Sequence, residues 1–365
     1  LKKNGACFGQ VAGFESPMWY AINDNKPNFE YSFGYQNWYD SAKFETENSR
    51  KNVGFFELTP FAKFEIQGEK AYSSLQYLCS NNIKKEIGSV TYTQMLNNKG
   101  GIETDLSVTC ISENNYRIIT GSSVREHDKK HILKYLDPTV DFYDITEDYS
   151  CFGIFGPKSR DLLTKIFGNE FSNEKFSFGK GKYLFKENIK IWFQRLSYVG
   201  ELGWELYIPI DQSKKIYEIL INEGKNHGLV HAGRLAMDIM RMEKGYLHWG
   251  HDISPAENPF EADLGFAVKL DKKYEFIGKE SLINLRNEQK KQIAMFVLLK
   301  SEPGKPLLLH DEPIYYKGQI VGETTSGNYS FCYNSNLAIG YINGKINKKL
   351  AENEIFEIEV AKNKY

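Results

Sequence analysis

Apolar residues follow two different spacings along this chain, and one stretch near residue 100 combines a strand pattern with a sharp turn. Apolar and polar side chains alternate through residues 106–111, which predicts a β-strand. An apolar-tending segment, residues 92–96, precedes it, and the polar corner at residues 97–101 ends in two glycines. This pattern predicts a β-hairpin. Asp105 lies where the second strand begins, and from the local sequence alone a turn acid is favoured over a catalytic base.

Five other segments carry helical signals, either apolar residues at helical spacing or residues typical of a helix boundary. A capping box, Ser123 to Glu126, predicts the start of one of them. Pro157 and Gly168 bound another, as expected for the first helical position and for the residue after a helix end. These five predicted helices cover residues 69–80, 123–136, 158–167, 213–223 and 234–244, and residues 276–282 are predicted to open a further helix.

The last part of the chain changes character after a charged stretch, residues 286–291. Only strand-like segments follow, which predicts a small β-domain over residues 286–365. The first 50 residues are rich in aromatic residues and glycine and have weak periodicity, so we expect an irregular lead-in segment over residues 1–50. The expected C-terminal strands are residues 293–298, 314–321, 322–327, 337–342 and 354–360.

Composition and charge exclude several classes of partner. The 365 residues carry 46 basic and 47 acidic side chains, so the net charge of −1 provides no global field toward nucleic acid or anionic lipid. No apolar run reaches membrane-spanning length, and the first residues lack the apolar core of a signal peptide. The five cysteines are widely spaced without a CxxC pair. They predict buried free thiols in a reducing compartment, either the cytoplasm or, in a eukaryote, the mitochondrial matrix.

Two histidine pairs suggest a metal site, but their spacing does not favour one. His248 and His251 have a glycine between them and no third ligand at a suitable spacing. His127 and His131 lie four residues apart on a predicted helix without the intervening glutamate of an HExxH motif. We therefore expect no metal. The sequence also shows no GxGxxG after a strand and no P-loop, so a flavin- or nucleotide-binding domain is not evident.

Several motifs together resemble one known family. They include MLNNKGGIETDL (residues 95–106), FGIFGPKSRDLL (residues 152–163) and the segment at residues 258–270. These motifs resemble the folate-binding aminomethyltransferases of the glycine-cleavage T-protein superfamily. The form of the first motif is most similar to the C-terminal halves of sarcosine and dimethylglycine dehydrogenases. The resemblance recurs along nearly the whole chain.

The resemblance implies a fold and a domain organisation. The fold class is α+β, a three-part ring with a C-terminal antiparallel β-barrel and with folate in the central opening. Residues 51–145 and 146–285 are implied to be interleaved folate-binding domains, and residues 286–365 the barrel.

The resemblance also implies roles for individual residues. Asp105 matches the family's essential aspartate and is the implied catalytic group, which orients or deprotonates the folate amine that attacks the one-carbon unit. Glu205 matches the pterin-binding glutamate, a charge-assisted acceptor for N–H donors. Met237 stands where the family has an arginine, a departure that leaves Arg234 and Arg241 as candidates to replace it. The implied cofactor-binding residues are Tyr92, Tyr198, Trp204, Glu205, Arg234 and Arg241. From the residues alone, aromatic side chains are more often core, and charged ones are more often solvated.

The implied function is tetrahydrofolate-dependent one-carbon transfer that produces 5,10-methylenetetrahydrofolate. The implied partners are an N-methyl amine donor and a flavin dehydrogenase domain, upstream or separate, which carries FAD outside this chain. Two alternatives stay open. One is a free-standing transferase that uses a lipoyl-carried aminomethyl group or a sulfonium methyl donor. The other is a non-catalytic folate-binding accessory protein, which would not need Asp105. We expect no nucleic-acid partner and no membrane partner.

Overall fold

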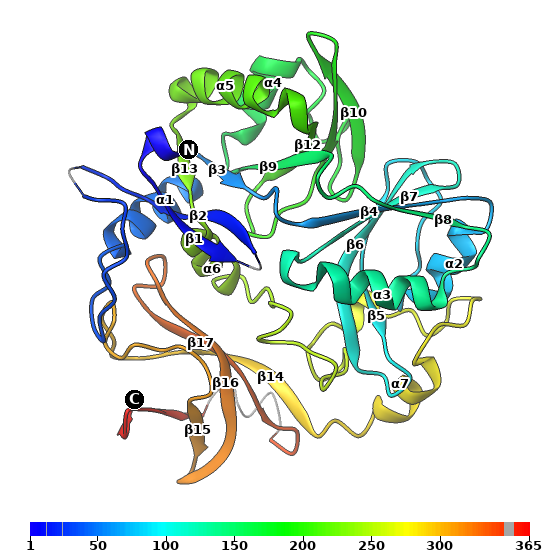
Figure 1. The fold of residues 1–365 in the computed structure, drawn as a ribbon. Helices are drawn as coiled ribbons and strands as arrows, with labels where there is room; N and C mark the ends of the chain where they lie inside the picture. Colours follow the sequence, from blue (N-terminus) through cyan, green and yellow to red (C-terminus); the bar gives the residue numbers. More distant parts are fainter. Residues whose placement is uncertain (12, 24, 347–353) are drawn as a thin grey trace.

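The computed structural model describes residues 1–11, 13–23, 25–346 and 354–365. Three β-sheets form three lobes around the middle of the molecule, and a two-stranded hairpin lies beside them (Figure 1). Each of the three sheets packs on its own cluster of buried apolar side chains. The architecture is the three-part mixture of helices and strands expected from the sequence, with an antiparallel sheet at the C-terminal end.

A six-stranded sheet forms the first lobe and separates two environments. Trp204, Leu206 and Ile208 of one strand belong to the core beneath helices α4 (Ser159–Phe167) and α5 (Ser213–Gly224). Because side chains alternate along a strand, Glu205 and Tyr207 point to the opposite face. Helix α6 (Arg234–Met242) packs there. In spatial order the strands are β10 (Gly181–Lys186), β11 (Ile189–Gln194), β12 (Gly203–Pro209), β9 (Tyr149–Phe155), β3 (Val53–Glu57) and β13 (Leu229–Ala232).

A five-stranded antiparallel sheet forms the second lobe and contains the predicted hairpin. Leu106 and Val108 of its second strand pack with Leu75 and Ile132, which come from the two helices of this lobe. Those helices are α2 (Ala71–Leu78) and α3 (Arg125–Tyr135). In spatial order the strands are β5 (Val90–Leu96), β6 (Ile102–Ser112), β7 (Asn115–Thr120), β4 (Ala62–Gln67) and β8 (Asp141–Asp144).

The turn between β5 and β6 is fixed by its own side chains. Asn97 Oδ1 accepts hydrogen bonds from the backbone N–H groups of Lys99 at 2.9 Å and Gly101 at 3.0 Å. A Cβ atom on Gly101 would lie 2.0 Å from the carbonyl oxygen of Pro255, so only glycine fits. The register that follows places Gln94 directly opposite Asp105. The predicted hairpin is confirmed.

The predicted capping box before α3 is wrong. The helix follows a short 3₁₀ turn, and its N-cap residue is Val124, with no side-chain capping hydrogen bond. Ser123 belongs to that turn and lines a cavity. Glu126 is exposed to solvent. Local sequence favoured the cap because it could not show that the serines face a cavity.

The first two lobes are interleaved along the chain. Strand β3, in the predicted domain 51–145, pairs with β9 and β13 of the six-stranded sheet, whereas β4 enters the five-stranded sheet. A later segment returns to the second lobe, where Ile277 joins its core and α7 (Lys279–Leu285) packs beneath the hairpin turn. The domain bounds themselves stay a prediction.

The expectation of an irregular lead-in over residues 1–50 is wrong for much of that segment. It contains a hairpin of β1 (Ala6–Val11) and β2 (Phe14–Tyr20), followed by helix α1 (Tyr39–Lys51). The helix escaped detection because its buried side chains are mostly small or polar: Ser41, Ala42, Glu45, Thr46 and Ser49. Glu45 accepts hydrogen bonds from the backbone of Tyr20 at 2.6 Å and of Gly233 at 2.8 Å, so it joins the hairpin to the start of α6.

The third lobe is the predicted C-terminal β-domain, an antiparallel sheet of six strands (Figure 1). The single strand expected at residues 314–321 is two strands, because Lys317 and Gly318 have positive φ and make a tight turn. In spatial order the strands are β14 (Lys291–Val297), β17 (Ser335–Asn343), β16 (Gln319–Ser330), β15 (Pro313–Tyr316), β18 (Glu357–Val360) and β19 (Asn363–Lys364). Among the residues that the structure describes, the 3₁₀ turns are η1 (Lys2–Asn4), η2 (Ser122–Val124), η3 (Ile210–Gln212), η4 (Lys225–His227) and η5 (Gly265–Ala267).

Two sequence-based expectations about the surface and the thiols can be compared with the structure. Among the residues described, no helix is both long enough and apolar enough to cross a bilayer. All five cysteines are free thiols, and four of them are buried as expected. Cys332 is exposed, which corrects the expectation for that residue.

Candidate functional site

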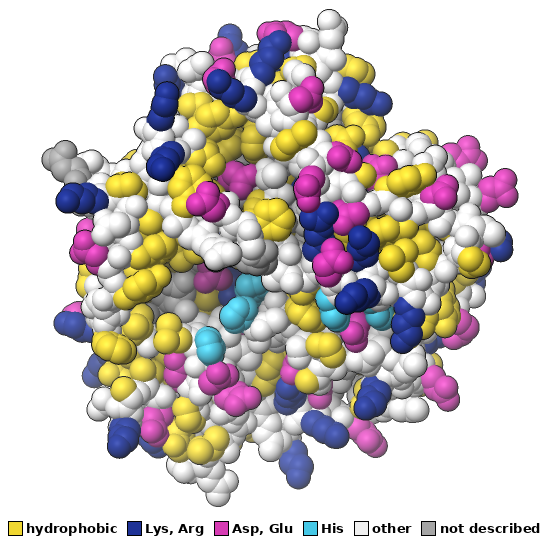
Figure 2. Space-filling model, viewed as in Figure 1, with side chains coloured by type: hydrophobic (Ala, Val, Ile, Leu, Met, Phe, Trp, Pro, Cys, Tyr) yellow, Lys and Arg dark blue, Asp and Glu magenta, His cyan; other side chains and the backbone are white. Residues whose placement is uncertain are grey.

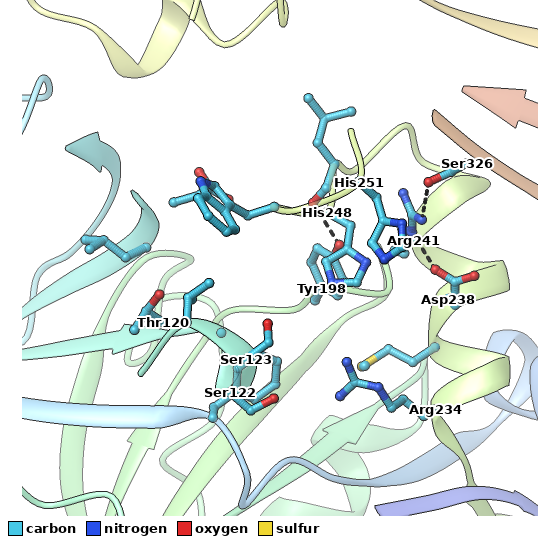
Figure 3. Close-up of a pocket in the computed structure, with 18 of the residues that line it drawn as sticks. Thr120, Ser122, Ser123, Tyr198, Arg234, Asp238, Arg241, His248, His251 and Ser326 are labelled. Carbon is cyan, nitrogen blue, oxygen red and sulfur yellow. Dashed lines mark hydrogen bonds and ion pairs between the residues drawn. The ribbon is translucent and has the colours of Figure 1, made fainter. Parts of the chain in front are cut away.

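A cavity of about 440 Å³ lies where the three lobes meet. Its size is typical of a small-molecule site. Side chains from β5, β6, β12, α6, the loop after α6 and β16 line it, so it is assembled from segments far apart in the sequence. Figure 2 shows histidine side chains near the middle of this face of the molecule, and Figure 3 shows part of the cavity wall.

Asp105 of β6 lies in the cavity wall, held by two neighbours on β5. The Nε2 atom of Gln94 donates a hydrogen bond to its Oδ1 at 2.8 Å, and the Tyr92 hydroxyl is a second hydrogen-bond partner. Burial raises the pKa of Asp105 to about 6, an effect that the two hydrogen bonds oppose and that the nearby Asp128 charge reinforces. A carboxyl group with this pKa can accept and return a proton near neutral pH.

Glu205 of β12 lines the same cavity from the other sheet. The Tyr207 hydroxyl donates to Glu205 Oε2 at 2.6 Å, and Gln194 Nε2 lies 3.5 Å from the same oxygen. Burial raises the pKa of Glu205 to about 7, and the Tyr207 hydrogen bond partly offsets this rise. Among the described residues, no hydrogen bond reaches Glu205 Oε1, which leaves that oxygen for a donor in the cavity.

The structure does not bring Trp204 to the cavity. Its side chain is fully buried and packs against Phe171 and Phe176, with ring centroids 5.2 and 5.9 Å away. The reason is the strand alternation: the neighbouring Glu205 faces the cavity, so Trp204 faces the core beneath α4. Its expected role in cofactor binding is therefore corrected to packing.

Tyr92 and Tyr198 both line the cavity. The Tyr92 ring stacks on Phe266 at 6.1 Å. The Tyr198 hydroxyl donates to the Leu247 carbonyl at 2.8 Å, and its ring stacks on Tyr246 at 6.2 Å. Burial is the main reason that the pKa of each phenol is raised, so both rings are neutral apolar walls with a polar tip.

The two arginines of α6 differ in how far they are already engaged. Arg241 is buried, and its guanidinium bonds Asp238 at 2.8 Å and Ser326 at 2.8 Å (Figure 3). It also bonds Asp252 at 2.6 Å. Arg234 also lines the cavity, but it makes no hydrogen bond or ion pair with any residue that the structure describes. Burial lowers the pKa of Arg234. An unpaired guanidinium in a cavity wall is available to a polar ligand, whereas Arg241 is committed to the protein.

Sequence reasoning missed a group of polar and apolar side chains in the wall. His248 and His251 lie in the loop after α6 with ring centroids 4.7 Å apart, and burial is the main cause that lowers the pKa of His248 to about 4. The histidine pair was visible in sequence, but its place in the cavity was not. The other missed wall residues include Met18, Ser122, Ser123, Trp249, Leu309 and His310. Within the described ranges, no group of three or more His, Cys, Asp or Glu side chains is arranged to hold a metal ion.

Comparison with known proteins accounts for the whole length of this fold. Residues 1–272 match the GCVT N-terminal domain, and residues 291–365 match the glycine cleavage T-protein C-terminal barrel domain. The chain belongs to the glycine cleavage T-protein family. The structure of the glycine cleavage system aminomethyltransferase T from Bartonella henselae matches with a TM-score of 0.83 at 20% identity, covering 100% of this chain and 92% of that chain. The expected family and fold are confirmed.

Two curated relatives place this T-protein family chain beside longer proteins. It is 34% identical over 330 residues to 4-methylaminobutanoate oxidase (formaldehyde-forming) of Paenarthrobacter nicotinovorans, covering 90% of this chain and 40% of that protein. It is 33% identical over 337 residues to mitochondrial dimethylglycine dehydrogenase of Homo sapiens, covering 92% of this chain and 39% of that protein. The chain therefore spans about two fifths of the length of each relative. Membership of an aminomethyltransferase-type family supports an enzymatic role.

Proposed function

We propose that this chain binds tetrahydrofolate in the central cavity and transfers a one-carbon unit at the oxidation level of formaldehyde onto it. The product is 5,10-methylenetetrahydrofolate. The observation that supports this proposal most strongly is the convergence of Asp105 and Glu205, which come from different sheets, on one cavity of about 440 Å³. Burial raises the pKa of both carboxyl groups toward neutrality, as is common where carboxyl groups take part in chemistry.

The chain's own groups suit a reduced pterin with an anionic tail. Glu205 presents an unpaired oxygen to accept N–H donors of the pterin edge, and Tyr92 and Tyr198 provide ring-sized apolar walls. Arg234 presents an unpaired guanidinium on the wall that Met237 shares, so it can supply the donor that the methionine lacks. When bound, tetrahydrofolate supplies the two amine nitrogens that take up the carbon. The proposed role of Asp105 is to accept a proton at its carboxylate, and its raised pKa supports this role.

The proposed one-carbon donor is an N-methyl amine that a flavin-dependent part of the protein, or a separate flavoprotein, oxidises. This part of the proposal rests on the two relatives, an oxidase and a dehydrogenase of which this chain spans only about two fifths. The present chain would then receive the carbon as an iminium or as formaldehyde. A free-standing aminomethyltransferase is the alternative on the same fold. Transfer from formaldehyde but not from an aminomethyl-lipoyl donor would favour the proposal over this alternative.

Isothermal titration calorimetry of the chain with tetrahydrofolate, under anaerobic conditions, tests the binding step. We expect saturable binding with one site per chain. Arg234→Met should weaken binding by about tenfold, because it removes a charge-assisted hydrogen bond worth about 1.5 kcal/mol. Arg241→Met is the matched comparison on the same helix, and we expect it to destabilise the fold by about 3–5 kcal/mol, because the fully buried Asp252 carboxylate loses its partner. Absence of binding by the parent chain would refute the proposed function.

A further inference from the structure

Four side chains close to the cavity form a hydrogen-bonded network: Glu103, His127, Asp128 and Thr120. His127, in the first turn of α3, has its Nε2 atom 3.0 Å from Glu103 Oε1 and its Nδ1 atom 2.9 Å from Asp128 Oδ1. The other oxygen of Asp128 accepts a hydrogen bond from the Thr120 hydroxyl. Asp128 is fully buried, whereas the His127 side chain is 39% exposed. The hydrogen-bonded network thus runs from the protein surface at His127 to Thr120 at the end of β7.

This chain of side chains reaches the cavity at two points. Thr120 lines the cavity beside Ser122 and Ser123 (Figure 3). Trp249 also lines it, and its ring lies 5.4 Å from the His127 ring, while its Nε1 donates to the Ile102 carbonyl at 3.1 Å. The network therefore adjoins the cavity that Asp105, the candidate catalytic residue, also lines.

The hydrogen bonds of His127 indicate the charges of the groups in this network. Both nitrogens of the His127 ring face carboxylate oxygens, so the form that satisfies both contacts is the imidazolium, which donates twice. The hydrogen bond to Asp128 is the largest cause that raises the pKa of His127. In return, burial raises the pKa of Asp128, and the contacts with His127 and Thr120 hold it down. A buried carboxylate stays ionised only when such partners compensate its desolvation.

We propose that His127 and Asp128 are positioning residues for Asp105: His127 keeps the buried Asp128 carboxylate ionised, and the negative charge of Asp128 favours the protonated form of Asp105. The structural support is the unbroken set of contacts from Glu103, two residues before Asp105 on β6, to Thr120, which lines the same cavity as Asp105. The negative charge of Asp128 is also one of the causes that raise the pKa of Asp105. The inference deepens the proposed function and rests on it only for the activity readout.

The other groups around these residues do not supply the same charge. Asp105 also faces the neutral phenols of Tyr92 and Tyr198, whose raised pKa values keep them uncharged. Asp128 and His127 also face Glu103 from β6, and His131 on the next turn of α3 has a pKa lowered by burial, so it is neutral. Loss of the proton donor His127 would therefore favour the neutral form of the buried Asp128 carboxyl group.

Two substitutions separate this role from a purely structural one. Asp128→Asn removes the charge and keeps the shape, so the pKa of Asp105 should fall by about half a unit. The acid limb of the one-carbon transfer profile then moves to lower pH. His127→Gln leaves Asp128 without its cation, so the pKa of Asp128 rises further, its neutral form is favoured, and the limb moves in the same direction. Because His127 acts through Asp128, the double variant should show no larger shift than Asp128→Asn alone.

A matched control comes from the same helix. Glu126 is exposed one residue before His127, and Glu126→Gln should leave the limb where it is in the parent. An unmoved acid limb in Asp128→Asn would overturn the proposal. Shifts that add fully in the double variant would also overturn it, because they would show that His127 acts on Asp105 by another route.

Two readouts do not depend on folate and keep failure of the inference distinct from failure of the proposed function. The first is the Asp105 carboxyl carbon, followed by ¹³C NMR in aspartate-labelled protein. Its signal is identified by its absence in Asp105→Asn, and its titration midpoint should fall in Asp128→Asn.

The second is Trp249 fluorescence, which reports the charge of His127, because an imidazolium quenches a neighbouring indole. We expect the emission to rise with pH at a midpoint above 6.5, the ordinary value for histidine, and this midpoint to fall in Asp128→Asn. The pH-dependent component should disappear in His127→Gln and in Trp249→Phe. An unchanged carbon midpoint in Asp128→Asn would overturn the inference, even if folate transfer is observed.

Discussion

Asp105 and Glu205, two of the carboxyl groups that line the cavity, have similar burial but different surroundings. Glu205 is held by Tyr207 at 2.6 Å within a sheet whose far face packs on two helices, and no cause of its pKa shift is another anion. Asp105 is held by two side chains of the adjacent strand and also feels the charge of Asp128. Burial alone raises the pKa of a carboxyl group toward neutral pH, while its neighbours decide whether that pKa is fixed or can be changed. Glu205 therefore suits recognition, and Asp105 suits proton transfer.

The largest expected effect comes from removing the proton acceptor while keeping its shape. In Asp105→Asn, one-carbon transfer from formaldehyde to tetrahydrofolate should fall by about 10²–10⁴-fold, the usual contribution of a general base. Binding of tetrahydrofolate should stay within about threefold of the parent, because the amide keeps the hydrogen-bonding shape. Single-turnover kinetics and calorimetry separate the two quantities. If binding falls as much as the rate, Asp105 is a recognition group, and the contrast with Glu205 breaks down.

The next effect is the reverse pattern at the other carboxyl group. Glu205→Gln should weaken tetrahydrofolate binding by about 10–100-fold, because it replaces a charge-assisted acceptor by a neutral one. Transfer at saturating folate should stay near the parent rate, since Glu205 does not take the proton. A titration followed by single-turnover measurements at saturation checks both statements. A large fall in the saturated rate with unchanged affinity would assign the chemistry to Glu205.

A third prediction concerns stability and needs no ligand. In the folded protein the pKa of Asp105 is about 6 and that of Glu205 about 7, both above their ordinary values. The folded state therefore binds extra protons between about pH 4 and 7, and stability falls as pH rises through that window. The neutral variants Asp105→Asn and Glu205→Gln should each be more stable than the parent above pH 7, by about 1–3 kcal/mol. The gain should vanish near pH 4. Urea denaturation at both pH values checks the sign.

The fold was predictable wherever local patterns carry their own boundaries. The β5–β6 hairpin follows from its polar corner and glycines, and α4 ends at Gly168 as expected. Its N-cap is Lys158, so Pro157 lies one residue before the cap and not at the first helical position. Helix α1 was missed because Ser41, Ala42 and Ser49 bury a small, polar face, so no apolar stripe marks it. The pairing of β3 with β9 and β13 is a long-range event that no local pattern encodes.

The site was predictable where strand alternation could be combined with the family resemblance. Asp105, Glu205, Tyr92 and Tyr198 lie in one cavity, although their roles stay predictions. Trp204 was misplaced because its neighbour in sequence lies on the other face of the strand. Sequence also could not rank the two arginines of α6: Arg241 is occupied by partners from the loop and from β16, which only the tertiary fold brings together.

The smallest expected effect compares the two glutamines that support the carboxyl groups. Gln94→Leu removes the 2.8 Å donor to Asp105, so the pKa of Asp105 should rise by about half a unit, and the acid limb of transfer should move to higher pH. Gln194→Leu removes only a long 3.5 Å contact to Glu205, where Tyr207 remains the main donor, so folate affinity should change by less than about threefold. Its cost is stability of about 1–3 kcal/mol, because the buried Thr109 hydroxyl loses its 2.8 Å acceptor. Equal effects of the two variants on catalysis would mean that both carboxyl groups are tuned in the same way. Opposite pH shifts in Asp128→Asn and Gln94→Leu would instead show that the charge of Asp128 and the hydrogen bond from Gln94 act on Asp105 in opposite directions.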